Sequence, residues 1–428
     1  MKRSIGSMWS RLDHAAKLYA SMGKDSNTAT FRLSATLTER IDPEVLQKAT
    51  DQTMNRYAKF RVHLAKGIFW SFLSRNTNSL VVEREWDYPC YPIRAKGPTS
   101  HLIRVLYFEN RVSVEFFHAL TDGTGGLSFL KTLVMAYLGL QGHVIHTEGL
   151  MISPDGLPHT GEDSDAFVDF QSEWLEHINP QRRFAQKARG VYGTAFDPYG
   201  HNVVEAILSS DALKTVAKEY GVSVTTLLLA ATLKALANTD QKPDDRRFVI
   251  AVPVNLRKAF LSNTLRNFFI VVNIGETIDA KADFREVVLG VENEMAEKLT
   301  RESLAETVAD TMHFDNNLPS RMLPNFLKRF AIRFGFQHFS QPATSMTLSN
   351  LGEVQIPPEM EPFVERIGFV LYPDSGSPIN VAVVACNGLA TISFARSIVE
   401  ADFVLNYVNL LNDLVEGDIV VSSNEWGM

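Results

Sequence analysis

The most chemically informative stretch of the sequence is FFHALTDGTGG, residues 116–126, which joins the end of a predicted strand to the start of a predicted helix. Loops at such positions commonly expose their side chains for binding or catalysis. Because the pKa of histidine is about 6.5, a neutral imidazole at His118 could accept a proton from a reacting group at pH 7. Asp122 and Gly123 complete a His-x-x-x-Asp-Gly pattern, which makes His118 a candidate general base.

The motif alone leaves a second interpretation open. His118 could be a half-buried histidine that hydrogen-bonds a backbone carbonyl, with Asp122 and Gly123 forming an ordinary turn. A match of three residue types at fixed spacing also arises by chance in a chain of 428 residues with 11 histidines and 25 glycines. The sequence around the motif is therefore needed to choose between a general base and a structural histidine.

The first half of the chain alternates predicted strands and helices around this segment. Asp42 as N-cap and Pro43 at the first helical position predict a helix that runs to Tyr57. A short helix is expected at 11–19 and another helix at 127–138, opened by Gly125 and Gly126. The expected strands cover 30–37, 61–73, 79–85, 101–108 and 111–118.

Between about residues 142 and 200 the periodicity fades, and we place the crossover between two domains there. The expected lobes are 1–180 and 201–428. In the second lobe, Ser223 or Thr225 could cap a largely buried helix, and residues 283–310 read as one long amphipathic helix. The other elements expected there are strands at 202–209, 247–255, 268–277, 344–351, 368–373, 379–387 and 389–397, and a closing helix at 400–415. The pattern is that of an α+β protein.

The context of the motif resembles the superfamily of chloramphenicol acetyltransferases, peptide-synthetase condensation domains, plant acyltransferases and alcohol O-acetyltransferases. The similarity to its bacterial alcohol-acetyltransferase-like branch extends over nearly the full length. It rests on FRLSATL, GIFWSFL, RVLYFENRVSVEFFHALTDGTGGLSFLKTL, EYGVSVTTLLLAATLKAL, VPVNLRKAF and TLSNLGEV, in that order. Phe117 replaces a second histidine that often precedes the motif, and the plant signature Asp-Phe-Gly-Trp-Gly is absent. The first departure fits the alcohol-acyltransferase branch better than the peptide-condensing one.

The resemblance implies two chloramphenicol-acetyltransferase-like lobes, each a mixed sheet with covering helices, and an active-site channel between them. It implies that His118 activates an alcohol for direct attack on acyl-CoA. Acyl-CoA would be a co-substrate, with no permanently bound cofactor and no metal. Asp122 and Gly123 would shape the loop, and PVNLR places Arg257 where the partner of Asp122 is expected, although Arg257 could also be a solvated charge.

The segment TLSNLGEV is expected, by the same resemblance, to approach the channel from the second lobe. Thr347, Ser349 and Asn350 are therefore candidates for the oxyanion donor or a substrate contact. Each of these side chains could instead make its hydrogen bonds within its own turn or strand. Two further alternatives stay open: the donor could be a carrier-protein thioester, or the protein could bind an acyl ligand without catalysis.

The composition limits the kinds of binding partner that we expect. A formal net charge of -7 argues against a nucleic-acid ligand, so we expect a small alcohol acceptor and an acyl-CoA donor. Cys90 and Cys386 are too few for a disulfide scaffold and lie in no metal-binding pattern. No signal peptide is expected, because charged residues interrupt the N-terminal stretch. We expect a cytoplasmic monomer.

The stretch LPNFLKRFAIRFGFQHF, residues 323–339, is unusual in an acidic chain because it interleaves aromatic residues with Lys328, Arg329 and Arg333. One interpretation is a packed helix whose basic residues face solvent. The other is that the stretch flanks the channel mouth, where its cations attract the CoA phosphates or an anionic membrane surface.

Overall fold

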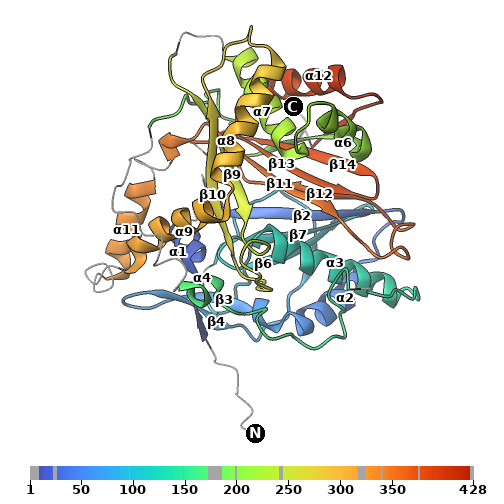
Figure 1. Ribbon diagram of the computed structural model, residues 1–428. Coiled ribbons are helices and arrows are strands. Elements are labelled where there is room, and N and C mark those ends of the chain that lie inside the picture. The colour runs from blue at the N-terminus through green and yellow to red at the C-terminus, as the bar shows by residue number, and fades with distance from the viewer. Residues whose placement is uncertain are drawn as a thin grey trace.

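A computed structural model of the chain describes residues 9–22, 27–95, 97–147, 149–171, 186–197, 200–240, 244–316, 324–336, 338, 341–374 and 376–424. These residues form a five-stranded, a seven-stranded and a three-stranded sheet, with helices packed against the two larger sheets (Figure 1). The α+β architecture with two lobes agrees with the sequence-based prediction.

The sheet of the first lobe has the strand order β12-β2-β7-β6-β5. These strands are β2 (Thr30–Leu37), β5 (Val82–Arg84), β6 (Ile103–Phe108), β7 (Arg111–Phe117) and β12 (Val364–Val370). Every residue of β2 is buried, because this strand has a neighbour on each side and is covered by α3 (Gly123–Leu140). The helix α2 (Pro43–Arg56) packs on α3, and the side chain of Asp42 caps it as predicted by accepting from the N–H groups of Glu44 and Val45.

The sheet of the second lobe has the order β10-β9-β11-β13-β14-β8-β15. Its strands are β8 (Asn202–Ser209), β9 (Phe248–Asn255), β10 (Phe269–Glu276), β11 (Met346–Val354), β13 (Ile379–Cys386), β14 (Leu389–Arg396) and β15 (Val420–Ser423). Strand β11 is parallel to both its neighbours, whereas the other pairs are antiparallel, so the sheet is mixed.

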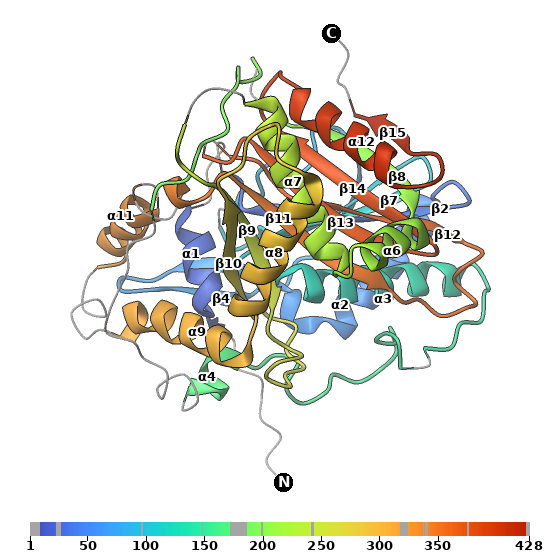
Figure 2. The ribbon, with the colours of Figure 1, turned by 45° about the horizontal axis from the view of Figure 1, so that its top comes forward.

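Four helices lie together on one side of this sheet in Figure 2. They are α6 (Ser210–Glu219), α7 (Val224–Thr239), α8 (Phe284–Lys298) and α12 (Asp402–Leu414). Helix α7 packs against both α8 and α12, which explains why most of its side chains are buried. Of the two candidate caps, the Ser223 hydroxyl accepts from the N–H of Thr226.

The prediction of one helix over 283–310 is wrong. The segment forms α8 and a separate helix, α9 (Arg301–Asn316). The hydroxyl of Thr300 accepts a hydrogen bond from the N–H of Ser303 at 3.2 Å, as an N-cap does, and so starts a new helix. The apolar periodicity of the segment does not register this interruption.

Strand β12 crosses between the halves of the chain. It follows β11 of the second lobe in sequence but pairs with β2 in the sheet of the first, with Ile367 opposite Ala35. Its side chains Ile367 and Phe369 are buried in the core of the first lobe. The domain boundaries at residues 180 and 201 stay a prediction. Strand β12 shows that the sheet of the first lobe includes a strand from the second half of the chain.

The remaining elements flank the two lobes. The three-stranded sheet consists of β1 (Trp9–Arg11), β4 (Ser71–Arg75) and β3 (Val62–Lys66) in that order. The remaining helices among the described residues are α1 (His14–Met22), α4 (Ala166–Asp169) and α11 (Asn325–Gly335), with 3-10 turns at Ala58–Phe60 and Gln341–Ala343. In the described part of the chain, no single helix has the length and apolarity of a membrane span, and only α6 with α7, bent by 84°, meets that test as a pair.

Candidate active site

His118 lies at the junction that the sequence indicated, directly after the last residue of β7. Its N–H donates to the carbonyl of Ala29 at 2.7 Å and so extends the pairing of β7 beyond the end of β2. The chain then turns tightly, with the N–H of Leu120 donating to the carbonyl of Phe117. Asp122 is the N-cap of α3, so the motif spans the whole connection between a buried strand and a buried helix.

Aromatic rings surround the imidazole of His118. Tyr19 of α1 stacks on it with ring centroids 4.1 Å apart, and Phe31 and Phe269 pack at 4.9 and 5.4 Å. Burial lowers the pKa of His118 below its usual 6.5, while Asp122 acts in the opposite direction. The residue keeps some solvent exposure. A ring in this environment is neutral at pH 7, which is the form a general base needs.

A hydrogen-bonded chain fixes the orientation of the ring. Nδ1 of His118 lies 3.1 Å from Oδ1 of Asn267, whose Nδ2 donates to the carboxylate of Asp13 at 3.3 and 3.4 Å. Because the Asn267 amide directs its N–H groups to Asp13, its oxygen faces His118 and accepts from Nδ1–H. The proton on Nδ1 leaves the lone pair on Nε2 as the basic position.

The sequence analysis did not identify Asn267 or Asp13. Both are almost fully buried, and Asp13 also caps α1 through the N–H of Ala16 and lies 3.6 Å from Arg266. They are far from His118 in sequence, and no spacing rule connects them. Asp13 was placed inside the helix predicted at 11–19, whereas the helix begins at His14 and Asp13 caps it, and the only signal at Asn267 was its position before a predicted strand.

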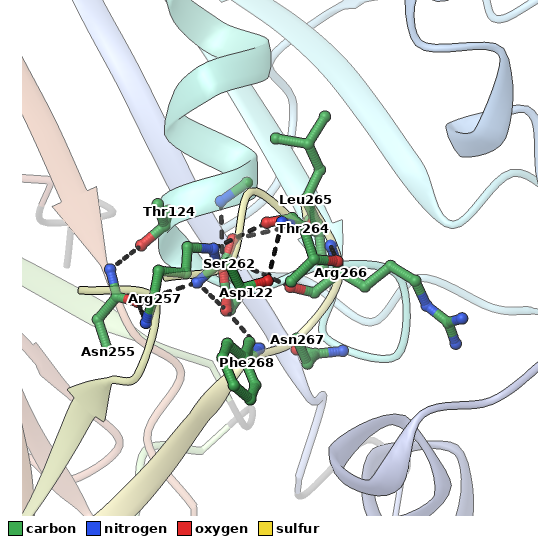
Figure 3. Close-up of polar contacts among 12 residues, drawn as sticks. Asp122, Thr124, Asn255, Arg257, Ser262, Thr264, Leu265, Arg266, Asn267 and Phe268 are labelled. Carbon is green, nitrogen blue, oxygen red and sulfur yellow. Dashed lines mark hydrogen bonds and ion pairs between the residues drawn. The ribbon is translucent and has the colours of Figure 1, made fainter. Parts of the chain in front are cut away.

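Asp122 and Arg257, which the sequence analysis paired, form a two-pronged ion pair (Figure 3). Nη1 and Nη2 of Arg257 donate to the two carboxylate oxygens at 2.9 and 3.0 Å. The same carboxylate accepts from the N–H groups of Gly125 and Phe268. Side-chain exposures of only 6% and 10% place this pair in the interior, where its charges are weakly screened. Asp122 is therefore fully engaged and cannot act as the third member of a catalytic triad.

Both partners of the motif come from one loop of the second lobe. Residues 256–268 connect β9 to β10 and carry Arg257 to Asp122 (Figure 3). The same loop carries Asn267 to His118. The loop is fastened to the first lobe by Thr121, whose hydroxyl donates to the carbonyl of Leu265 at 2.6 Å. Thr264 in turn donates to the carbonyl of Ser164 in the crossover segment. The catalytic candidate is thus assembled where the two lobes meet.

Two glycines of the motif pack closely against the second lobe, one against a leucine side chain that can shift and the other against backbone that cannot. A Cβ at Gly123 would lie 2.8 Å from Cδ2 of Leu351 in β11. At Gly125 it would collide with the hydroxyl of Thr121 and the carbonyl of Leu265, which is backbone and cannot move aside. The glycine-rich sequence therefore allows the loop of the second lobe to pack directly on the start of α3.

The three oxyanion candidates lie on β11, and the structure separates them. Thr347 and Ser349 alternate with Leu348, which is buried in the core of the second lobe, so they face the opposite side, as does Leu351 beside Gly123. The amide of Asn350 instead donates to Thr225 and accepts from the N–H of Gly352. No contact joins any of the three to His118 among the described residues. Ser349 and Thr347 are thus better placed to face a substrate than Asn350.

A cavity of about 320 Å³ lies beside the motif, between the first lobe and the loop 256–268. Its walls include Leu120, Leu265 and Arg266 and the ion pair of Arg56 with Glu162, and His118 is not among its lining residues. The predicted channel to His118 stays a prediction.

The architecture is the two-lobe fold of solved condensation domains and of a trichothecene 15-O-acetyltransferase. No family model and no curated protein matches the sequence. Solved structures establish the fold over almost the whole chain, and at these levels of identity they establish the fold alone.

Three of these structures are representative. Polyketide synthase associated protein 5 from Mycobacterium tuberculosis has a TM-score of 0.61 at 14% identity, with 94% of this chain and 96% of that chain covered. TRI101 of F. graminearum, complexed with coenzyme A and deoxynivalenol, has a TM-score of 0.61 at 13% identity, covering 95% and 97%. The starter condensation domain of rhizomide synthetase, in complex with C8-CoA, has a TM-score of 0.61 at 12% identity, covering 97% and 99%.

Proposed function

We propose that this protein is an acyltransferase that moves an acyl group, in the simplest case acetyl, from acyl-CoA to the hydroxyl of a small alcohol. The observation that carries the proposal is the setting of His118: a partly exposed imidazole at the junction of the lobes, with Nδ1 3.1 Å from Oδ1 of Asn267 and a pKa that burial lowers. A histidine held in this way has one free basic nitrogen. The fold supports acyl transfer as the class of reaction, and the surroundings of His118 support its role as the general base.

In the proposed mechanism, Nε2 of His118 removes the proton of the acceptor hydroxyl as its oxygen attacks the thioester carbonyl carbon. The resulting tetrahedral intermediate carries a negative charge on the former carbonyl oxygen. When it collapses, the C–S bond breaks and the departing thiolate takes the proton from the imidazolium. The products are an ester and the free thiol of CoA, and the histidine returns to its neutral form without a covalent enzyme intermediate.

Asn267 and Asp122 have separate roles in this scheme. Asn267 holds Nδ1–H and stabilises the imidazolium that forms in the transition state, because its oxygen favours the protonated ring. Asp122 and Arg257 hold the loop that presents His118. We assign the oxyanion donor to Ser349, whose side chain lies on the strand face directed to the motif.

The donor is proposed from the solved structures. The complex of TRI101 with coenzyme A and that of the rhizomide starter domain with C8-CoA both contain this thiol carrier, so a CoA thioester is the first donor to test. The likeness to peptide-synthetase domains keeps a carrier-protein thioester as the second. Cys90 and Cys386 are buried free thiols, and with them we propose a reducing, cytoplasmic setting for a monomeric enzyme.

A thiol-release assay tests the proposal. The purified protein is incubated with acetyl-CoA, hexanoyl-CoA or octanoyl-CoA and a panel of alcohols and amines, and free CoA is measured with a chromogenic disulfide. We expect release that depends on an alcohol and is abolished in His118→Ala. His143→Ala is the matched control, because His143 is also half-buried and packs on an aromatic ring, Phe363, outside the site.

Three results would contradict the proposal in different ways. Release that survives in His118→Ala would remove the histidine from the mechanism. Turnover only with an acyl carrier protein would replace the donor. Binding of acyl-CoA without transfer to any acceptor in the panel would favour the non-catalytic alternative.

A further inference from the structure

Six large apolar side chains from two distant segments are exposed side by side on the surface. Three belong to the turn between β3 and β4, and three belong to α11, and the two elements lie next to each other in both Figures 1 and 2. They form what we call the aromatic patch: Ile68, Phe69, Trp70, Leu327, Phe330 and Phe334. Ile68 is 78% exposed and Phe330 is 68% exposed. Phe69 packs beside Trp70 and Phe330 beside Phe334, and a group of exposed apolar side chains, unlike a single one, indicates an interaction site.

Hydrogen bonds hold the two segments of the aromatic patch together. The N–H of Asn325 donates to the carbonyl of Ile68 at 2.8 Å, and its side-chain amide donates to Gly67 and Ser71. The ammonium of Lys328 donates to the carbonyl of Phe69 at 3.0 Å. The aromatic patch is therefore a built surface rather than a chance meeting of two loops.

The orientation of α11 is the reverse of that in an ordinary surface helix. Leu327, Phe330 and Phe334 follow the spacing of one helix face and are exposed. Arg333 is only partly exposed, since its Nε donates to the carbonyl of Ser21 at 2.6 Å. A helix that served only as scaffold would bury the apolar stripe and solvate the cations. The outward stripe indicates a contact with an apolar medium.

The two segments that carry the aromatic patch contain charges of a single sign. Neither residues 62–75 nor residues 324–336 contain an aspartate or glutamate, in a chain with 49 acidic residues. The two segments contribute five cationic residues, which are Lys66, Arg75, Lys328, Arg329 and Arg333. Aromatic side chains surrounded by lysine and arginine match the boundary of a bilayer, where acyl chains lie below anionic headgroups.

We propose that the aromatic patch docks this protein on the surface of a bilayer containing anionic phospholipid. The apolar side chains of the turn and of α11 enter the boundary between headgroups and acyl chains. Lys66 and Arg329 contact the phosphates, and Lys328 and Arg333, which donate to carbonyls of the protein, add positive charge beside them. The alternative target of these cations, the phosphates of CoA, leaves the outward aromatic stripe unexplained. Vesicle binding needs no acyl transfer, so the docking proposal can be tested independently of the proposed function.

The test is co-sedimentation of the purified full-length chain with vesicles of phosphatidylcholine alone or with 30% phosphatidylglycerol, at about 0.1 M salt. We expect binding to the anionic vesicles, weakened by added salt. The double variant Trp70→Ser with Phe330→Ser should bind at least tenfold more weakly. The matched control is Trp86→Ser with Leu157→Ser, because Trp86 is 60% exposed against 58% for Trp70 but lies outside the aromatic patch. Equal thermal midpoints for the two variants show that both are folded.

Four results would overturn the proposal. The first two are that the wild type does not bind anionic vesicles, or that the control loses binding as much as the patch variant. The third is a wild-type dimer, detected by light scattering, that the patch variant converts to monomer while vesicles stay unbound; the occupant is then a second copy of the chain. The fourth is that replacing Lys328, Arg329 and Arg333 by Gln raises the KM for acyl-CoA but leaves vesicle binding unchanged, which would assign the cations to the donor.

Discussion

The ion pair of Asp122 and Arg257 gives the sharpest quantitative prediction. The Asp122→Asn variant keeps an oxygen that can accept from the N–H of Gly125, so the cap of α3 is preserved while the negative charge is lost. Arg257→Met removes the guanidinium, which also donates to the carbonyls of Thr264 and Arg266. Each single variant leaves one buried group without its counterpart.

The expected magnitude follows from burial. Because the two side chains are only 6% and 10% exposed, we expect each single variant to lower the free energy of unfolding by about 3 to 5 kcal/mol. The double variant leaves no buried charge unpaired, so it should be about 2 kcal/mol more stable than the sum of the single losses implies. Arg40 and Glu109 form the control pair, since exposures of 83% and 44% should reduce their coupling to less than about 1 kcal/mol.

Urea denaturation followed by tryptophan fluorescence measures all four corners of both cycles. Arg257→Lys is a further comparison, because it keeps the charge without the planar fork and should be intermediate. A coupling energy for Asp122 and Arg257 that is no larger than that of Arg40 and Glu109 would refute the reasoning. The ion pair of Asp122 and Arg257 would then contribute no more stability than an exposed pair, and the glycines would determine the conformation of the loop.

Four further predictions concern catalysis. His118→Ala should lower kcat by about 10²- to 10⁴-fold, measured by thiol release on any substrate that the wild type turns over, and unchanged turnover would exclude it as the base. Because burial lowers the pKa of His118, the acid limb of kcat/KM should have its midpoint below pH 6.5, with activity lost as the pH falls through that value. Asn267→Ala should lower kcat by up to about 100-fold at nearly constant KM and move that limb further down, whereas a purely structural role would leave the limb in place. Ser349→Ala should lower kcat by about 10²- to 10³-fold, and Asn350→Ala much less; equal effects would reject Ser349 as the oxyanion donor.

Much of the fold could be predicted because its signals are local. The strand 30–37 and the helix that begins at Pro43 have the predicted starts, since alternation and an N-cap are properties of a few adjacent residues. The break at Thr300 was missed because a threonine inside an amphipathic pattern can equally face solvent in mid-helix. The place of β12 could not be found either, since strand pairing between residues 32–37 and 364–370 leaves no local trace.

The residues of the candidate site were likewise predicted where the signal is local and missed where it is not. His118 and Asp122 lie in one motif, and the resemblance extended it to Arg257, which the structure places against Asp122. Asn267 and Asp13 were missed, because a buried asparagine acquires its role only when a loop of the other lobe carries it to the imidazole. Asn350 was included with Ser349 on proximity in sequence, and only the alternation of β11 separates them.

The position of β12 also shapes how the protein is made. On the ribosome, β2 is synthesised more than 300 residues before the strand that completes its sheet. At about 5 to 20 residues per second, one edge of this fully buried strand stays open for roughly 15 to 60 seconds. A strand edge with free N–H and C=O groups is a template for pairing with other chains. Soluble yield should therefore depend on what shields the nascent edge, and a fragment that ends at the crossover would carry the open edge permanently.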